Sequence, residues 1–115
     1  MPYRAMHILV KHEESRRCSS WKDEEGKTIR SRTKEQADDM LREFKRQIEA
    51  GEKSFEDIAR VESDCGSAAQ GGNIGEFTQE EIQAPFFEAF IKLKPGEMSD
   101  VVHTDSGSHI IKRLE

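Results

Sequence analysis

A short basic segment gives the chain its clearest potential for binding an anion. Lys11 ends an apolar run, and Arg16 and Arg17 follow within the stretch "KHEESRRCSSW". Arginine binds phosphate or carboxylate oxygens in a bidentate manner, and lysine adds a compact positive charge. From these residues alone two interpretations stay open: an anion-binding site, or a solvated loop whose charges only serve solubility.

Two histidines are placed for acid–base chemistry. His7 lies between apolar neighbours, and His109 stands at the start of the last apolar run. Buried histidines on neighbouring strands can hydrogen-bond to each other and to a nearby hydroxyl, or they can act as acid–base catalysts. We predict that His12 and His103, which lack such a setting, are surface residues.

The segment "SDCGSA" places Cys65 in a turn rich in small residues. A thiol there can be an activated nucleophile if a histidine serves as its base. The signatures of known cysteine proteases are absent from the sequence, so this pairing is a weak signal. The sequence also contains no metal-ligand cluster, no P-loop and no GxGxxG motif.

Five apolar side chains lie in sequence around Gln83, namely Ile74, Phe77, Ile82, Phe86 and Phe90. Most of them are expected in the core. Ile82, Gln83 and Phe86, however, fall where a loop meets the start of a helix, and that position is also compatible with a pocket wall.

These side chains must be positioned by strands at both ends of the chain. Residues 3–11, "YRAMHILVK", predict a strand whose side chains alternate between two faces. One face carries Ala5, His7, Leu9 and Lys11, and the other carries Met6, Ile8 and Val10. Residues 12–32 lack apolar periodicity and predict a long loop, a kind that is often functional. The stretch "SDVVHTDSGSHIIKRLE" predicts a hairpin of two strands around "TDSG".

Three helices and a short strand are expected between these ends. Thr33 and Gln36 form a capping box ahead of apolar residues at helical spacing. Ser54 is the expected N-cap of a second helix. Residues 73–77 predict a short strand, and residues 84–93 predict a third helix. This order indicates an α+β fold with one mainly antiparallel sheet.

Composition narrows the function classes. The 115 residues suit one domain, and the formal net charge is −5. Residues 1–34 sum to +4 and residues 35–115 to −9, so an acidic body argues against general nucleic-acid binding. No apolar run is long enough to cross a membrane, and no secretory signal is evident. The two cysteines lack metal-ligand spacing and are expected to be reduced thiols in the cytosol or nucleus.

Six segments occur in an order and at a spacing that resemble the parvulin family of peptidyl-prolyl cis/trans isomerases. They are "HILVKH", "SRR…SSW", "SDCGSA…GGNIGEF", "QAPFFEAF", "KPGEMSDVV" and "TDSGSHIIKR". The resemblance covers nearly the whole chain. It implies a single parvulin domain over residues 1–115, standing alone without a WW module. The implied fold is FKBP-like, with a four-stranded, mainly antiparallel sheet surrounded by helices.

The resemblance also implies three groups of site residues. The basic loop resembles the subgroup selective for phosphoSer–Pro and phosphoThr–Pro, with a phosphate site at Lys11, Arg16 and Arg17. The proline pocket is implied at Ile74, Ile82 and Phe86, with Gln83 nearby. The polar cluster around the isomerising bond is implied at His7, Cys65, Ser106 and His109. The family often has Leu and Met where this chain has Ile74 and Ile82, which changes the shape of an apolar wall. The segment "WKDEEGKTIRS" looks longer than in the shortest relatives.

The function implied is non-covalent isomerisation of phosphoSer/phosphoThr–Pro bonds, without a cofactor or metal. The implied partners are phosphorylated Ser/Thr–Pro proteins, with no nucleic acid and no membrane, and the protein is expected to be a monomer in cytoplasm and nucleus. Three alternatives remain: a thiol enzyme using Cys65, a phosphopeptide-binding module without turnover, and a parvulin indifferent to phosphate.

Overall fold

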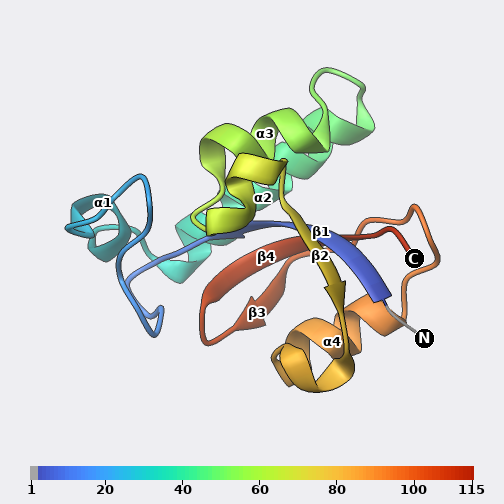
Figure 1. The fold of residues 1–115 in the computed structure, drawn as a ribbon. Helices are drawn as coiled ribbons and strands as arrows, with labels where there is room; N and C mark the ends of the chain where they lie inside the picture. The colour runs from blue at the N-terminus through green and yellow to red at the C-terminus, as the bar shows by residue number, and fades with distance from the viewer. Residues whose placement is uncertain (1–2) are drawn as a thin grey trace.

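Four strands form one sheet in the order β2–β1–β4–β3 in the computed structural model, which describes residues 3–115 (Figure 1). Their bounds are β1 Tyr3–Val10, β2 Asn73–Phe77, β3 Val102–Thr104 and β4 Gly107–Arg113. Every strand pair in this order is antiparallel. The predicted α+β fold with a mainly antiparallel, four-stranded sheet is therefore confirmed.

Helices cover both faces of the sheet (Figure 1). Their bounds are α1 Lys27–Arg30, α2 Lys34–Glu49, α3 Phe55–Glu62 and α4 Ala84–Ile91, with 3₁₀ turns at Gly66–Gln70 and Gln79–Glu81. Helices α2 and α3 pack on one face, and α4 lies on the other. Within residues 3–115, none of these helices is both long and apolar enough to cross a membrane.

The starts of α2 and α3 are fixed by the caps that the sequence predicts. The Thr33 hydroxyl accepts the backbone N–H of Gln36 at 3.1 Å, and the Gln36 side chain accepts the N–H of Thr33 at 2.9 Å. The Ser54 hydroxyl accepts the N–H of Asp57 at 3.1 Å. Each bond satisfies a backbone donor that the first helical turn leaves without an internal partner.

Alternation along β1 divides the core into two parts. Met6, Ile8 and Val10 pack against α2 and α3, in a cluster that also holds Ile110 of β4. Ala5 and Ile111 face the other way and pack against the phenylalanines of α4. The predicted division of β1 side chains between two faces is confirmed, and His7 consequently lies on the α4 side.

The segment predicted as one long loop contains the short helix α1. The Asp23 carboxylate accepts the backbone N–H groups of Lys27 and Ile29 at 3.1 and 3.0 Å, and Ile29 is fully buried. A single turn is too short to give apolar periodicity, so the sequence pattern does not reveal it. The helix is stabilised by the Asp23 carboxylate, which satisfies backbone N–H groups of its first turn.

The prediction that His12 is a surface residue is wrong. Its side chain is buried, and its Nδ1 accepts the backbone N–H of Glu14 at 3.1 Å. The Ser15 hydroxyl accepts the N–H of His12 in turn, at 3.0 Å. Burial lowers the pKa of His12, which keeps the ring neutral and able to accept at Nδ1. The ring thus closes the turn that begins the basic segment. His103 is exposed, as predicted.

Candidate active site

A cavity of about 490 Å³ opens between the sheet and α4. Its apolar wall combines residues from β1, β2 and the start of α4: Leu9, Ile74, Phe77, Ile82 and Phe86. Its polar side chains come from segments far apart in the sequence: His7, Arg16, Cys65, Glu76, Glu81, Gln83, Ser106 and His109. An apolar cavity with a few convergent polar groups is the usual form of a small-ligand site.

The two histidines form a direct pair at the floor of this cavity. The Nδ1 atoms of His7 and His109 lie 3.0 Å apart, and both rings are buried. The rings stack with centroids 5.2 Å apart, and Phe86 packs edge-on against each of them. Burial holds the pKa of His109 well below its usual value, and the charges of His7 and His103 act in the same direction. His109 is therefore neutral at pH 7.

Thr104, which is not among the site residues named from the sequence, extends the pair. Its Oγ1 lies 2.7 Å from Nε2 of His109 and accepts the backbone N–H of Ser106 at 3.1 Å. When the Thr104 hydroxyl donates to Nε2 of His109, Nδ1 of His109 carries the proton and donates to Nδ1 of His7. His7 then carries its own proton on Nε2, which can donate to another group. Within residues 3–115 that buried Nε2 has no hydrogen-bond partner. The sequence signal for Thr104 is alternation within the predicted hairpin. Thr104 pairs with Gly107, and His109 lies two residues further along β4, so Thr104 and His109 point to the same face.

Cys65 lies in the same cavity, next to His7. Burial raises the pKa of its thiol, but the adjacent His7 imidazole and Ser67 lower that pKa by a larger amount, so that the net value is about 6. The thiolate is therefore the main form at pH 7. Its position is fixed by β1, because the Asp64 N–H donates to the Leu9 carbonyl at 2.7 Å.

Gln83, at the N-terminal end of α4, ties the apolar wall to the β3–β4 turn. Its Nε2 donates to the Ser106 hydroxyl at 2.8 Å, and its Oε1 accepts the N–H of Asp105 at 3.2 Å. The Asp105 carbonyl also accepts the backbone N–H of Arg16 at 2.7 Å. The turn at residues 105–106 thus contacts both the apolar wall and the basic segment.

Lys11 and Arg17 line a second cavity, of about 550 Å³, beside the first. Nζ of Lys11 donates to the Ser19 carbonyl at 2.7 Å, and Nε of Arg17 donates to the Ser19 hydroxyl at 3.1 Å. Burial lowers the pKa of Lys11, Asp64 opposes this effect, and the charge of Arg17 adds to it. A bound anion would relieve the repulsion between these two cations.

The basic segment is anchored to the body of the protein by buried polar groups. Nε1 of Trp21 donates to the Ser63 carbonyl at 2.8 Å. The Asp64 carboxylate accepts the Lys11 backbone N–H at 2.9 Å, while an Arg32 guanidinium nitrogen donates to the Lys11 carbonyl at 2.9 Å. Since Ser63 and Asp64 directly precede Cys65, these bonds fix the basic segment relative to the thiol.

All eleven site residues named from the sequence line one of these two adjoining cavities. Nine line the first cavity: His7, Arg16, Cys65, Ile74, Ile82, Gln83, Phe86, Ser106 and His109. Lys11 and Arg17 line the second. The cavities adjoin at two places in the chain: Arg16 and Cys65 line the first, and their neighbours Arg17, Asp64 and Gly66 line the second. In the part of the chain that the structure describes, no three His, Cys, Asp or Glu side chains are grouped to hold a metal ion.

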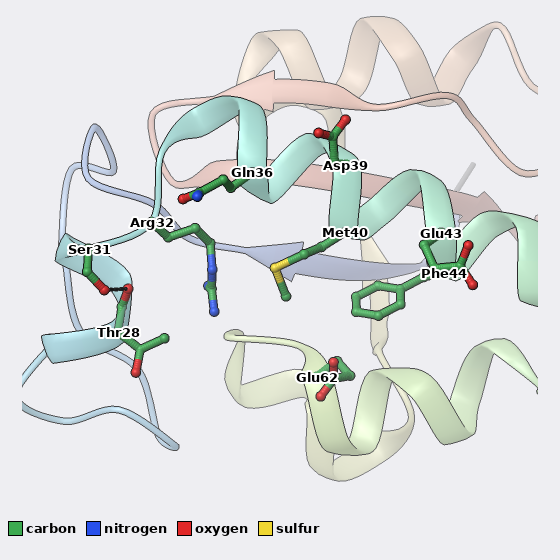
Figure 2. Close-up of a pocket in the computed structure, with 9 residues that line it drawn as sticks. All are labelled: Thr28, Ser31, Arg32, Gln36, Asp39, Met40, Glu43, Phe44 and Glu62. Atoms are coloured by element: carbon green, nitrogen blue, oxygen red, sulfur yellow. Dashed lines mark hydrogen bonds between the residues drawn. The ribbon is translucent and has the colours of Figure 1, made fainter.

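A larger cavity, of about 710 Å³, lies away from these residues, between α1, α2 and α3 (Figure 2). Met40 and Phe44 form its apolar part, and Arg32 points into it. The carboxylates of Asp39 and Glu43 on its rim pair with arginines of α2. Its lining residues include no cysteine or histidine and only one cation, Arg32, so we do not assign it as the candidate site.

Comparisons with known proteins agree with this geometry. The family model described as Rotamase, the PPIC-type PPIase domain, matches residues 7–115. The chain is 52% identical over 110 residues to "Peptidyl-prolyl cis-trans isomerase Pin1" of Malus domestica, covering 96% of this chain and 91% of that protein. It is 50% identical over 110 residues to the protein of the same name in Arabidopsis thaliana, covering 96% and 92%.

A solved structure shares the same fold. "Peptidyl-prolyl isomerase ESS1 from Candida albicans" superposes with a TM-score of 0.91 at 36% identity, over 99% of this chain and 63% of that one. The chain therefore resembles this family both in its sequence and in the arrangement of its strands and helices. The chain belongs to the PPIC-type, or parvulin, family of peptidyl-prolyl cis-trans isomerases.

Proposed function

We propose that this protein isomerises phosphoSer–Pro and phosphoThr–Pro bonds in other proteins, and that it does so without forming a covalent intermediate. The observation that carries the proposal is the arrangement of Lys11, Arg16 and Arg17 beside an apolar cavity that ends in a buried polar cluster. A cation group next to an apolar cavity matches a substrate with an anionic residue followed by proline.

The phosphate end of the substrate is bound by the basic segment. A phosphorylated side chain carries roughly −1.5 to −2 charges at neutral pH. Arg16 and Arg17 offer forked donors, and Lys11 adds a point charge that is held in place by the Ser19 carbonyl. Since Asp64 and Trp21 anchor the segment, the phosphate would be held at a fixed distance from the apolar wall.

The proline ring occupies the apolar wall of the first cavity, formed by Ile74, Ile82 and Phe86. An amide must lose its planarity to rotate, against a barrier of about 18–20 kcal/mol. A thousandfold acceleration requires only about 4 kcal/mol of preferential binding to the twisted amide. Contacts at the two ends of the substrate supply that preference if they fit the twisted geometry better than the planar one.

The polar cluster acts on the amide itself. Twisting removes resonance, so the nitrogen becomes a better acceptor and the carbonyl oxygen loses negative charge. The Ser106 hydroxyl accepts from Gln83 and therefore keeps its own proton free to donate. A thiolate at Cys65 repels a charged carbonyl oxygen and so disfavours the planar amide. His7 and His109 maintain the network rather than transfer protons.

Two-dimensional NMR exchange on matched peptides tests this function. The peptides contain phosphoSer–Pro, Glu–Pro or Ser–Pro in one flanking sequence, with catalytic amounts of protein. We expect cis–trans cross-peaks chiefly for the phosphopeptide. Equal exchange for all three would remove the phosphate role but keep the isomerase. Absence of exchange in all three, with the protein folded, would leave a phosphopeptide-binding module or a thiol enzyme.

One observation favours a second candidate, a thiol enzyme. The lowered pKa of Cys65 beside His7 is the arrangement that activates a cysteine nucleophile. This candidate predicts that Cys65→Ser abolishes activity and that a covalent intermediate accumulates. Mass spectrometry of the protein mixed with substrate peptide separates the two, because the isomerase mechanism adds no mass.

We also propose that the protein acts as a monomer in the cytoplasm and nucleus. Both cysteines are free thiols, which fits a reducing compartment. Light scattering after size-exclusion chromatography tests the first statement, and imaging of a fluorescent fusion tests the second.

A further inference from the structure

A buried carboxylate lies behind the active-site hairpin, on the face of the sheet that packs against α2. Asp38 of α2 accepts a hydrogen bond from the Ser108 hydroxyl at 2.6 Å. Nε2 of His103 lies 2.9 and 3.0 Å from its two carboxylate oxygens. Ser108 is fully buried and Asp38 is 8% exposed. None of the three residues lines the catalytic cavity.

The register of the hairpin connects this cluster to the active site. His103 on β3 pairs directly with Ser108 on β4, so Asp38 bonds to both members of one cross-strand pair. The next residue on each strand, Thr104 and His109, points to the opposite face. Those two form the hydrogen bond at the cavity floor. One carboxylate therefore holds both strands of the hairpin, one residue away from the groups that face the substrate.

We propose that Asp38 is a positioning residue for the β3–β4 hairpin, and through it for the turn that joins the phosphate and proline subsites. This proposal rests on the isomerase function described above. The turn at Asp105 and Ser106 contacts Arg16 on one side and Gln83 on the other. A shift of the hairpin would therefore change the distance between the two ends of the bound substrate.

A purely stabilising role would not require a carboxylate at this position. Burying a charge removes its hydration, and well-packed apolar side chains often stabilise a protein as much. A carboxylate that accepts directional hydrogen bonds instead favours one position of α2 relative to the β3–β4 hairpin, because the buried Ser108 hydroxyl has its acceptor only in that position. The same preference for one arrangement is what a positioning role needs.

The surroundings keep Asp38 charged. Burial raises its pKa, but the hydrogen bonds from Ser108 and His103 and the charge of Arg42 lower it below its ordinary value. His12 lies close enough to feel the charges of both Asp38 and His103, and His109 feels the charge of His103. The carboxylate is therefore ionised at neutral pH, and its hydrogen bonds are charge-assisted.

The test compares three variants by the NMR exchange assay at saturating peptide. Asp38→Ala removes the cluster's acceptor without lowering helix propensity. Asp39→Ala is the matched control, since Asp39 is the next residue of α2 and pairs with Arg42 on the surface. Asp38→Asn keeps one acceptor for Ser108. Nitrogen chemical shifts of the His109 ring report the geometry of the active site and can be read without any turnover.

We expect Asp38→Ala to lower kcat at least about fivefold with little change in KM, because a small misplacement of the turn weakens only the twisted-state contacts. The His109 ring shifts should move in this variant. Asp39→Ala should leave both readouts unchanged, and Asp38→Asn should recover most of the loss.

The proposal is overturned if Asp38→Ala is less stable but has wild-type kcat and His109 shifts at a temperature where it is folded. An equal effect of Asp39→Ala would also overturn it, because the effect would then come from charge on α2. If Asp38→Ala does not fold, Ser108→Ala decides: the same changes in smaller amount support the proposal, and unchanged readouts reject it. If the wild type shows no isomerisation, the proposed function fails, but the His109 ring shifts still test the positioning role of Asp38. A shift in Asp38→Ala supports that role, and unchanged shifts reject it.

Discussion

The Nδ1 atoms of His7 and His109 lie 3.0 Å apart, although 101 residues separate these histidines along the chain. The pair joins β1 to β4 at the floor of the catalytic cavity, and Thr104 holds the far nitrogen of His109 at 2.7 Å. His109 is neutral because it is buried. The pair therefore acts first as a structural link between the two central strands.

This link predicts that His7→Leu harms folding more than chemistry. Leucine fills the site but leaves Nδ1 of His109 buried without its partner, which costs about 1–3 kcal/mol of unfolding free energy. Urea unfolding measures that loss. Exchange NMR on the folded protein should show activity lowered by no more than about tenfold, the loss expected for Cys65→Ser, because removing His7 also removes the main lowering of the Cys65 pKa. A variant with wild-type stability but no turnover would instead give His7 a direct catalytic role.

The depressed pKa of Cys65 makes the stability of the protein depend on pH. The folded-state pKa is about 6, below the ordinary value of 9.0, so the unfolded chain binds the proton more tightly. The stabilising contribution is therefore complete above pH 9 and is lost as the pH falls through 6. Urea unfolding in reducing buffer should show a free energy that rises between pH 6 and 9.

Cys65→Ala should reduce that rise, and Cys18→Ala should retain it because it leaves Cys65 in place. Cys18 is a suitable control, since it is the other free thiol of the chain and lies in the basic segment. The same slope in wild type and Cys65→Ala would mean that Cys65 is not a thiolate in the folded protein.

The sequence predicted those parts of the fold and site that depend on local pattern. Alternation along β1 placed His7 on the cavity side, and the caps at Thr33 and Ser54 set the starts of α2 and α3. These features are fixed by residues close together in the chain. The resemblance of six segments to the parvulin family then supplied the site residues that line the two cavities.

Features that depend on contacts between distant residues were missed. Thr104 looked like an ordinary turn residue, because its bond to His109 exists only once the hairpin has formed. Nothing near Asp38 in the sequence marks it for burial, because its partner Ser108 is 70 residues away. His12 was predicted at the surface because nothing nearby in sequence marks it as the acceptor that closes a turn. Polar residues carry no apolar periodicity, so their burial is decided by tertiary packing.

Cys65→Ser should slow the reaction without abolishing it. Serine keeps the size of the side chain but has no charge at neutral pH, so the repulsion of the planar carbonyl is lost. We expect kcat/KM to fall about tenfold, equivalent to about 1.4 kcal/mol. When the assay is repeated over a range of pH, it should also use the Glu–Pro peptide. The second ionisation of a phosphate, near pH 6, otherwise overlaps the ionisation of Cys65. Complete loss of activity, with a covalent adduct in the wild type, would favour the thiol enzyme.

Replacing both arginines of the basic segment should separate the phosphate role from the isomerase itself. Arg16→Ala with Arg17→Ala removes two of the three cations that line the adjoining cavities. Each charge-assisted hydrogen bond contributes about 1.5–3 kcal/mol, so kcat/KM for the phosphoSer–Pro peptide should fall at least about a hundredfold. Activity on the Ser–Pro peptide should change little, because that peptide has no phosphate for the arginines to bind.

The control for this pair is Lys22→Ala with Lys27→Ala, which removes two exposed positive charges from the residues that follow the basic segment. If the loss came from net charge alone, both double variants would slow the phosphopeptide reaction equally, and raising the salt concentration would abolish the difference from wild type. A loss confined to the arginine pair would mean that Arg16 and Arg17 contact the phosphate directly. Wild-type activity of the arginine pair on the phosphopeptide would make the protein an isomerase indifferent to phosphate.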